Sequence, residues 1–211
     1  MDQRLERVCA RLPVFPLPDT VLMPGALLPL HVFEPRYRAL IQHCLDGDGL
    51  MGIATLRPGY EADYDGAPGF YDTLGVGDII AHEGLPDGRY HILLRYVGRA
   101  RVEDELAVDH AFRVVRAAVL PEDESGGSPG LQRLKLLLLQ LGARSDDDDD
   151  PHRAIVEGGL ELVDRVAHQV LQESEDRREY LELDRVVDRI AKVEEALAGM
   201  LARGTEAVGD A

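Results

Sequence analysis

The sequence predicts an α+β protein: a partly closed β-barrel with one capped helix, followed by a helical bundle. Two observations predict this fold class. Before residue 121, short apolar stretches are separated by glycine- and proline-rich turns, which is typical of β-strands. After residue 128, apolar residues recur at three- and four-residue spacing, which indicates amphipathic helices. The predicted subdomains are 9–122 for the β-barrel and 128–204 for the helices.

The first part contains several strand candidates and a long loop. The predicted strands are 12–17, 21–23, 27–28, 50–56, 78–82, 89–97, 99–106 and 112–120. In the stretch 89–97, Tyr90, Ile92, Leu94 and Tyr96 alternate onto one face. We expect Gly98 to mark a bulge that bends this strand into the next one. The region 57–72 is rich in Gly, Pro, Asp and Tyr and predicts a surface loop.

One helix is predicted inside this β part. Glu34 precedes its first turn, and Pro35 takes the first helical position, where a missing N–H leaves no bond unmade. Gly47 stands where a left-handed C-terminal cap is expected. One apolar stripe runs along the helix through Tyr37, Leu40, Ile41, Cys44 and Leu45.

The second part predicts three or four helices. Ser128 and Pro129 begin the first of them, and residues 131–141 are apolar nearly all round, so we expect this helix to be buried. A second helix is expected to open at residues 150–151. The last helix is expected from 186 to about 204. The five aspartates 146–150 predict an exposed loop, without the glycine and glutamate of a calcium-binding loop.

Charge and composition restrict the class of protein. The 211 residues carry a formal net charge of −16, with 12 basic and 17 acidic residues in 1–120 and 11 and 22 in 121–211. Such an acidic surface repels phosphate backbones, which disfavours general nucleic-acid binding. No apolar run is long enough to span a membrane, the N-terminus lacks a signal-peptide core, and two cysteines do not form a disulfide framework. A cytoplasmic protein is therefore expected.

Three separate motifs resemble a known family. The stretch 12–17 reads LPVFPL, a Pro-Gly turn follows at 24–25, and 28–37 reads LPLHVFEPRY. Downstream, 87–94 reads DGRYHILL and leads into the basic strand 98–102. Together they resemble the N-terminal substrate-binding domain of the Lon ATP-dependent proteases, whose barrel is similar to the PUA fold. The pattern departs at 75–80, which leaves the register of the middle strand open.

The resemblance implies contacts with unfolded polypeptide at the start of the first helix and in the apolar groove beside it. The candidate polypeptide-binding residues are His31, Phe33, Glu34, Arg36 and Tyr37. The alternative is structural: Glu34 caps the helix and accepts a hydrogen bond from an arginine, while Tyr37 packs in the core. On this alternative, Arg36 lies exposed at the helix start.

Catalytic motifs are absent from the sequence. A P-loop needs Gly-Lys-Ser/Thr, and the only two lysines, Lys135 and Lys192, follow Leu134 and Ala191. Lon peptidases use a serine nucleophile activated by a lysine, but both lysines here lie within helical periodicity, and we expect no room for a protease domain. The seven histidines show no metal-ligand spacing, and Cys44 lies on the apolar stripe of a helix. We therefore expect no enzyme, no cofactor and no metal, but a free-standing version of the binding domain.

Three functions follow in order of preference. The first is a non-catalytic module that binds unfolded or extended polypeptide and acts as an adaptor, a holdase or a regulator of a protease, with a protease or chaperone as further partner. The second is a PUA-like RNA-associated domain, which would have to use Arg89, Arg95, Arg99 and Arg101. The third is a hydrolase of unknown type. Whether an apolar helix face forms a homodimer is left open.

Overall fold

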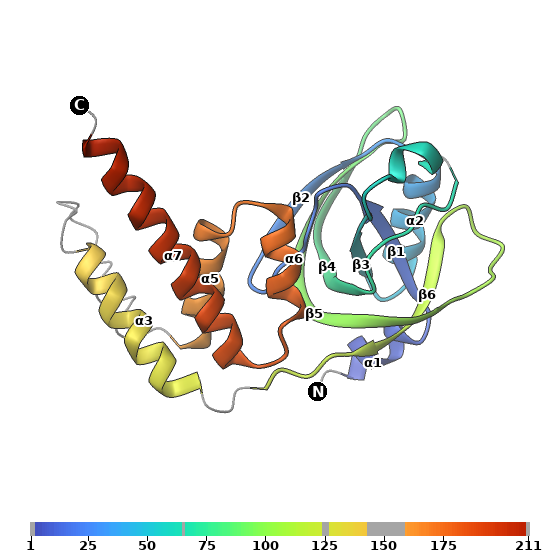
Figure 1. Ribbon diagram of the computed structural model, residues 1–211. Helices are drawn as coiled ribbons and strands as arrows, with labels where there is room; N and C mark the ends of the chain where they lie inside the picture. The colour runs from blue at the N-terminus through green and yellow to red at the C-terminus, as the bar shows by residue number, and fades with distance from the viewer. Residues whose placement is uncertain (1–2, 65, 124–126, 143–158, 210–211) are drawn as a thin grey trace. The chain divides into compact units, whose positions relative to one another are not determined.

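The computed structural model describes residues 3–64, 66–123, 127–142 and 159–209 (Figure 1). The chain divides into two compact units, Met1–Pro121 and Glu122–Ala211. The first unit holds all six strands, and the second is helical. The predicted α+β class is confirmed. None of the helices in the described part of the chain is both long and apolar enough to cross a membrane.

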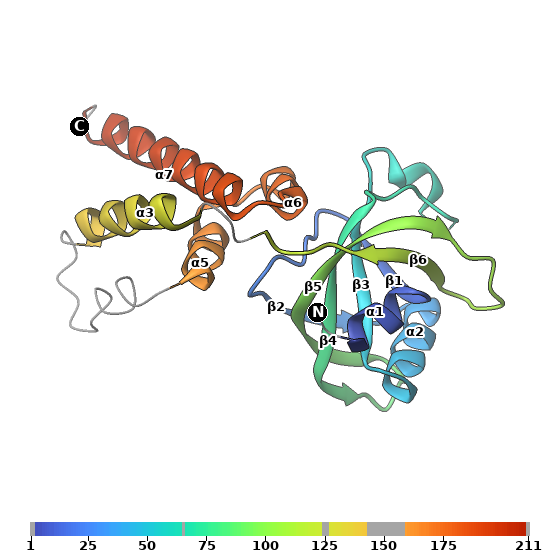
Figure 2. The same ribbon diagram turned by 90° about the horizontal axis from the view of Figure 1, so that it is seen from below.

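The first unit is a mixed six-stranded sheet that closes on itself (Figure 2). Its strands follow the order β2-β5-β4-β3-β1-β6, and an additional β5–β6 pairing joins the two ends of the five-stranded portion. β2 lies outside this ring and pairs with β5 alone. The elements are α1 (Gln3–Cys9), β1 (Leu12–Leu17), β2 (Leu27–Val32), α2 (Pro35–Asp46), β3 (Leu50–Thr55), η1 (Tyr60–Asp63), β4 (Thr73–Gly84), β5 (Tyr90–Glu105) and β6 (Arg113–Val119).

Two strands are longer than predicted. The expected strand 78–82 is the second half of the twelve-residue β4, and 89–97 and 99–106 are one sixteen-residue β5. A register shift sets Val76 opposite Gly98 and Gly77 opposite Tyr96, so Val97 is the extra residue, next to the predicted bulge at Gly98. The expected strand 21–23 is wrong, because this segment is a loop.

Two apolar clusters fill the first unit. One lies under α1 and includes Leu5, Cys9, Leu12 and Leu74. The other includes the α2 stripe, with Tyr37, Leu40, Ile41 and Cys44 all buried against strand residues such as Ile53 and Leu94. The predicted apolar stripe of this helix is confirmed.

The end of α2 differs from its prediction. Gly47 has a φ of −113°, so it is not the left-handed cap. The left-handed residue is Gly49, with a φ of +71°. Its N–H donates to the carbonyl of Cys44 at 2.9 Å, as does that of Gly47 at 3.1 Å. The chain therefore reverses two residues later than the sequence suggests.

Gly75 fits closely against the buried loop at Leu22. It lies opposite Ile53 of β3 and Arg99 of β5, which fixes the register that the sequence left open. A Cβ added at Gly75 would come 2.1 Å from the carbonyl oxygen of Leu22. Glycine is required here because no side chain fits between the strand and the loop.

We expect Gly75→Ala to destabilise the protein by about 1–3 kcal/mol, because either the loop or the strand must shift. The measurement is the melting temperature by circular dichroism. Gly69→Ala is the matched control, since its Cβ would meet Arg57 Cδ at an ordinary 3.7 Å. Equal melting temperatures for the two variants would show that the loop moves freely.

The second unit consists of four described helices. They are α3 (Gly127–Gly142), α5 (Leu160–Val170), α6 (Ser174–Glu182) and α7 (Val186–Gly209). Both α3 and α5 pack against α7. The sequence did not separate α6 from its neighbours. The predicted helix opening at 150–151 and the aspartate run 146–150 lie outside the described residues, as does His152.

The expected burial of the leucine-rich helix α3 is wrong. Leu134 is fully buried, but Leu136 is 61 % exposed, and Leu137, Leu138 and Leu139 are half-buried. Consecutive leucines face every side of a helix, whereas α7 covers only one side of α3.

A buried polar network holds the core of the second unit. Arg189, which is 4 % exposed, forms an ion pair with Glu122 at 2.7 Å and donates from Nε to the carbonyl of Leu183 at 3.1 Å. Its guanidinium lies 5.6 Å from the ring centre of Tyr180, whose hydroxyl donates to Asp164 at 2.7 Å. Burial raises the pKa of the Asp164 carboxyl.

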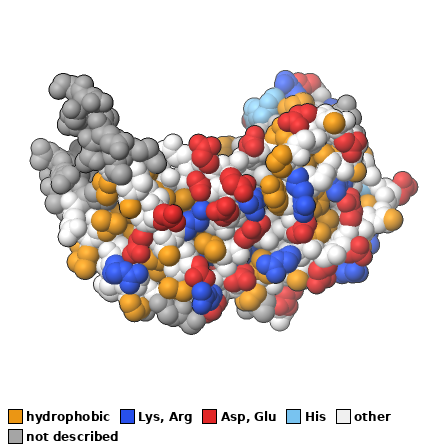
Figure 3. Space-filling model, in the orientation of Figure 1, with side chains coloured by type: hydrophobic (Ala, Val, Ile, Leu, Met, Phe, Trp, Pro, Cys, Tyr) orange, Lys and Arg blue, Asp and Glu red, His pale blue; other side chains and the backbone are white. Residues whose placement is uncertain are grey.

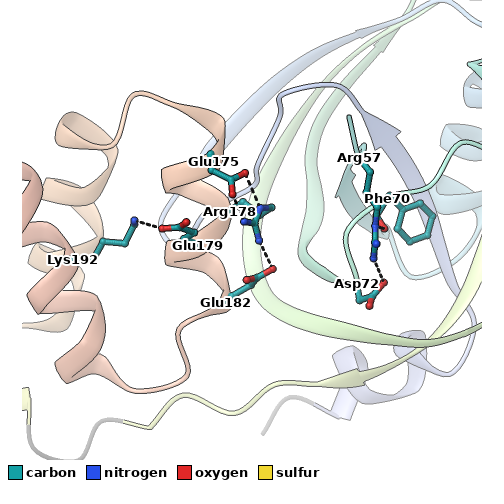
Figure 4. A network of polar contacts seen from close by, with 8 residues as sticks. All are labelled: Arg57, Phe70, Asp72, Glu175, Arg178, Glu179, Glu182 and Lys192. Atoms are coloured by element: carbon teal, nitrogen blue, oxygen red, sulfur yellow. Dashed lines mark hydrogen bonds and ion pairs between the residues drawn. The ribbon is translucent and has the colours of Figure 1, made fainter. Parts of the chain in front are cut away.

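The acidic surface of α6 is paired with cations (Figure 4). Arg178 lies between Glu175 and Glu182, and forms an ion pair with each of them. Lys192 reaches from α7 to Glu179 at 2.7 Å. These pairs lower the repulsion between carboxylates on one short helix.

Candidate functional site

The exposed edge of the sheet is β2. Its residues alternate, with Leu28, Leu30 and Val32 turned toward the core, and Leu27, Pro29 and His31 turned to solvent. Phe33 follows the strand directly. Leu27 is 57 % exposed and Phe33 is 59 % exposed. We call Leu27, Pro29, His31 and Phe33 the β2 edge patch.

The main chain of β2 also has open hydrogen-bonding positions. The N–H of Tyr96 donates to the carbonyl of Ala26 at 3.0 Å, so this is a hydrogen-bonded pair. Such pairs alternate along an antiparallel ladder, so the main-chain groups of Leu27, Pro29 and His31 face away from β5. Within the described part of the chain, these three residues make no backbone hydrogen bond outside the sheet. Pro29, which has no N–H, stands where an edge strand tolerates proline.

Aromatic rings continue the β2 edge patch onto β5. The ring of His31 lies 6.0 Å from that of Phe33 and 4.9 Å from that of His91, in an edge-on arrangement. His91 Nδ1 lies 3.6 Å from Glu83. Leu93, directly opposite Pro29, is half-buried. The surface is apolar and aromatic, and it is bordered by Glu83 and by Arg95, which lies directly opposite Leu27.

A second cluster lies at the start of α2. Glu34 is the residue before the helix, but its side chain does not cap the helix. Its carboxylate accepts from Arg36 Nε at 2.9 Å and from the hydroxyl of Tyr64 at 3.0 Å. Arg36 also donates to the carbonyl of Tyr64 at 3.1 Å, and its guanidinium lies 4.7 Å from the ring centre of Tyr37. The cluster fastens the 57–72 loop to the helix start.

Tyr37 is part of the core. It is 6 % exposed, and its ring stacks on that of Phe15 at a centroid distance of 4.1 Å. Burial raises the pKa of its hydroxyl to about 12. The Arg36 side chain is only 20 % exposed, so it is not free in solvent as the structural alternative predicted. One oxygen of Glu34 pairs with Arg36 and the other accepts from the hydroxyl of Tyr64.

The five candidate residues therefore fall into two groups. His31 and Phe33 lie together on the exposed β2 edge patch, whereas Glu34, Arg36 and Tyr37 are held in the cluster at the helix start. Leu27 and Pro29 were not among the candidates. The signal for them was the alternation of 27–32, whereas the predicted strand ended at residue 28.

Both cysteines of the chain are buried as free thiols. Burial raises the pKa of Cys9 to about 11 and that of Cys44 to about 12, so both thiols stay protonated near neutral pH. Among the described residues, no group of three or more His, Cys, Asp and Glu side chains is arranged to hold a metal ion.

The basic cluster required for RNA binding is dispersed. Arg89 is paired with Asp87 at 2.6 Å, and Arg95 with Asp78 at 3.4 Å. Arg99 is fully buried and donates to the carbonyl of Pro121 at 3.0 Å, whereas Arg101 is exposed. On the face drawn in Figure 3, basic side chains are interspersed with acidic ones.

Comparison with known proteins identifies the family. The family model of the ATP-dependent protease La (LON) substrate-binding domain matches residues 11–199. The chain belongs to this family. The resemblance seen in the sequence is thereby confirmed, and the match covers the Lon substrate-binding domain and none of the catalytic domains.

Relatives and solved structures agree with this assignment. The chain is 23% identical to the Lon protease of Desulfosudis oleivorans over 187 residues, and 33% identical to Lon protease 2 of Syntrophobacter fumaroxidans over 129 residues. These matches cover 86% and 61% of this chain, but only 23% and 16% of the relatives, so the chain spans about a quarter or less of their length.

Two solved structures share the fold. The N-terminal domain of Lon protease from the Mycobacterium avium complex matches with a TM-score of 0.70 at 18% sequence identity. The match covers 89% of this chain and 98% of that domain. The Lon N-terminal domain protein from Xanthomonas campestris has a TM-score of 0.60 at 23% identity, with 89% and 97% covered. The Xanthomonas campestris structure is thus named after the domain and not after a whole Lon protease.

Proposed function

We propose that this Lon-type domain is a non-catalytic module that binds extended or unfolded polypeptide along the free edge of β2. Membership of the substrate-binding domain family supports binding of polypeptide. One observation carries the location: on β2, exposed apolar side chains and outward-facing main-chain groups occur on the same residues. A guest strand can form main-chain hydrogen bonds there while its side chains pack on the β2 edge patch.

In this proposal the cluster at the helix start positions the patch rather than contacting the guest. Glu34 and Arg36 fix the chain directly after Phe33, because their ion pair and the bonds to Tyr64 hold this turn. Arg36→Ala should then weaken polypeptide binding through a displaced Phe33, while the protein stays folded.

The test is fluorescence anisotropy with a labelled, permanently unfolded protein. Replacing Leu27 and Phe33 together by serine should weaken binding by about tenfold or more, since two large apolar side chains lose their contacts. Leu136→Ser is the matched control: Leu136 is equally exposed, but lies on α3 of the second unit. Wild-type protein that is folded and monomeric yet does not bind at tens of micromolar would refute the proposed function.

A second arm tests the main-chain contribution. A short apolar peptide should lose most of its affinity when alternate backbone nitrogens are methylated, because those N–H groups can no longer bond to the edge. Equal affinity for the methylated and unmethylated peptides would show that only side chains are recognised.

The cellular role follows from what is bound. A pull-down with the wild-type protein and the Leu27/Phe33 double variant distinguishes the alternatives. Recovery of many unrelated unfolded proteins by wild type alone would indicate a holdase. Recovery of one stoichiometric protease or chaperone would indicate an adaptor or a regulator.

A further inference from the structure

A separate pocket lies between α1, α2 and the strands β1 and β6. It has a volume of about 270 Å³ and opens to solvent. Its floor is apolar and is formed by Pro13, Leu50 and Val114, all of which are buried. Its rim carries basic side chains, among them Arg11 and His43. None of the residues of the β2 edge patch lines it.

The positive charge at the rim is only partly neutralised. Arg7 forms an ion pair with Asp48 at 2.6 Å, and this contact lowers the pKa of the Asp48 carboxyl. Arg11 forms no ion pair with any residue in the described ranges. One guanidinium at the mouth of the pocket therefore retains an uncompensated charge, in a chain that is strongly acidic as a whole.

Two imidazoles stand beside Arg11. The rings of His43 and His110 lie 5.1 Å apart, and His110 stacks on Phe112 at 4.8 Å with the planes only 6° apart. Partial burial lowers the pKa of His43, and the nearby His110 and Arg11 lower it further, whereas Asp46 raises it. Arg11 and the imidazoles of His43 and His110 thus line the same pocket, and Arg11 has no ion-pair partner among the described residues.

We propose that this pocket binds a small organic carboxylate, with the anionic group between Arg11 and the two imidazoles and the hydrocarbon part on the floor. The uncompensated guanidinium and the imidazoles supply charge-assisted donors for a carboxylate. An inorganic anion would make no favourable contact with the apolar floor of Pro13, Leu50 and Val114. A ligand with a short hydrocarbon chain would bury that chain there.

Binding should strengthen as the pH falls. The charged and titratable groups around His43 come from α1, the turn between α1 and β1, α2, the turn after α2, and the loop before β6. They are Arg7, Arg11, Asp46, Asp48 and His110. Burial and the basic neighbours lower the pKa of His43, and a bound anion would favour the protonated form of this imidazole. The same linkage makes the carboxylate bind more tightly below the imidazole pKa than above it.

The test is an NMR titration of the full chain with pentanoate at pH 5.5 and pH 8. We expect saturable shifts of the His43 and His110 ring protons at pH 5.5, and weaker binding at pH 8. Arg11→Gln should weaken binding about tenfold, as expected for loss of a charge-assisted contact. The matched control, Arg101→Gln, removes an exposed arginine of β5 and should leave the affinity within about twofold.

Three further probes decide the ligand class and source. Pentanamide should not bind, and inorganic phosphate should bind more weakly than pentanoate. A peptide with a free C-terminal carboxylate that binds this pocket more tightly than its C-terminal amide would identify a chain end as the source; equal affinity would leave a free carboxylic acid. Phosphate binding as tight as that of pentanoate would overturn the proposal. So would the absence of a ring-proton shift at about 50 mM pentanoate, a concentration well above the dissociation constant of a millimolar ligand. These outcomes are independent of polypeptide binding at β2.

Discussion

Replacing Tyr37 by alanine should destabilise the first unit by about 3 kcal/mol or more, because it leaves a cavity in the core beneath α2. The Tyr37 ring is nearly inaccessible and stacks on Phe15, and the Arg36 guanidinium lies over it. Removing the ring therefore loses packing on one side and a cation–π contact on the other. The measurement is thermal and urea unfolding followed by circular dichroism, since the chain contains no tryptophan.

Phe33→Ala is the matched control in the same motif. Phe33 is 59 % exposed, so its loss should change stability by less than about 0.5 kcal/mol. Tyr37→Phe removes only the hydroxyl and should retain most of the stability. If Tyr37→Ala and Phe33→Ala were equally mild, the ring would not be part of the core.

Replacing Arg189 by alanine should destabilise the second unit by about 3 kcal/mol. The substitution breaks the ion pair between Arg189 and Glu122 and the hydrogen bond from Arg189 Nε to the carbonyl of Leu183. It also removes the cation from beside Tyr180 and Asp164, where burial already raises the pKa of the carboxyl. Amide hydrogen exchange in α6 and α7 measures the effect in this unit alone.

Arg185→Ala is the control for this prediction. Arg185 pairs with Asp188 at 2.8 Å, but its side chain is 60 % exposed, so the pair contributes less than about 1 kcal/mol. If both variants lost similar amounts of amide protection in α6 and α7, the loss would come from removing any positive charge from the helix. It would then not be specific to the buried network.

Local periodicity was sufficient for the elements that pack one apolar face against the core. The stripe of α2 and the alternation from Tyr90 to Tyr96 were both predicted, because each depends on one face meeting a core. The first half of β4 was not predicted although it is buried, because its two glycines, Gly75 and Gly77, are uncommon in strands. β5 was predicted as two strands because Gly98 was expected to bend the chain between them. The leucines of α3 misled the prediction, because hydrophobicity alone does not show how many neighbours a helix has.

The candidate site was predicted in part. The motif at 28–37 includes His31 and Phe33 of the β2 edge patch, but sequence alone did not show which of its side chains face solvent. Tyr64 lies far from Glu34 in the chain, so its hydrogen bond to that carboxylate depends on the fold of the 57–72 loop. The free edge of β2 is likewise a property of sheet order and not of the strand itself.

The proline in the middle of β2 bears on how these molecules behave in crowded solution. An unprotected strand edge is a template on which identical copies can add to one another and aggregate. Pro29 interrupts that template, because a continuous ladder would lack a donor at its centre. With a net charge of −16, copies also repel one another. The edge is thus open to a single guest strand and poorly suited to growth into fibrils.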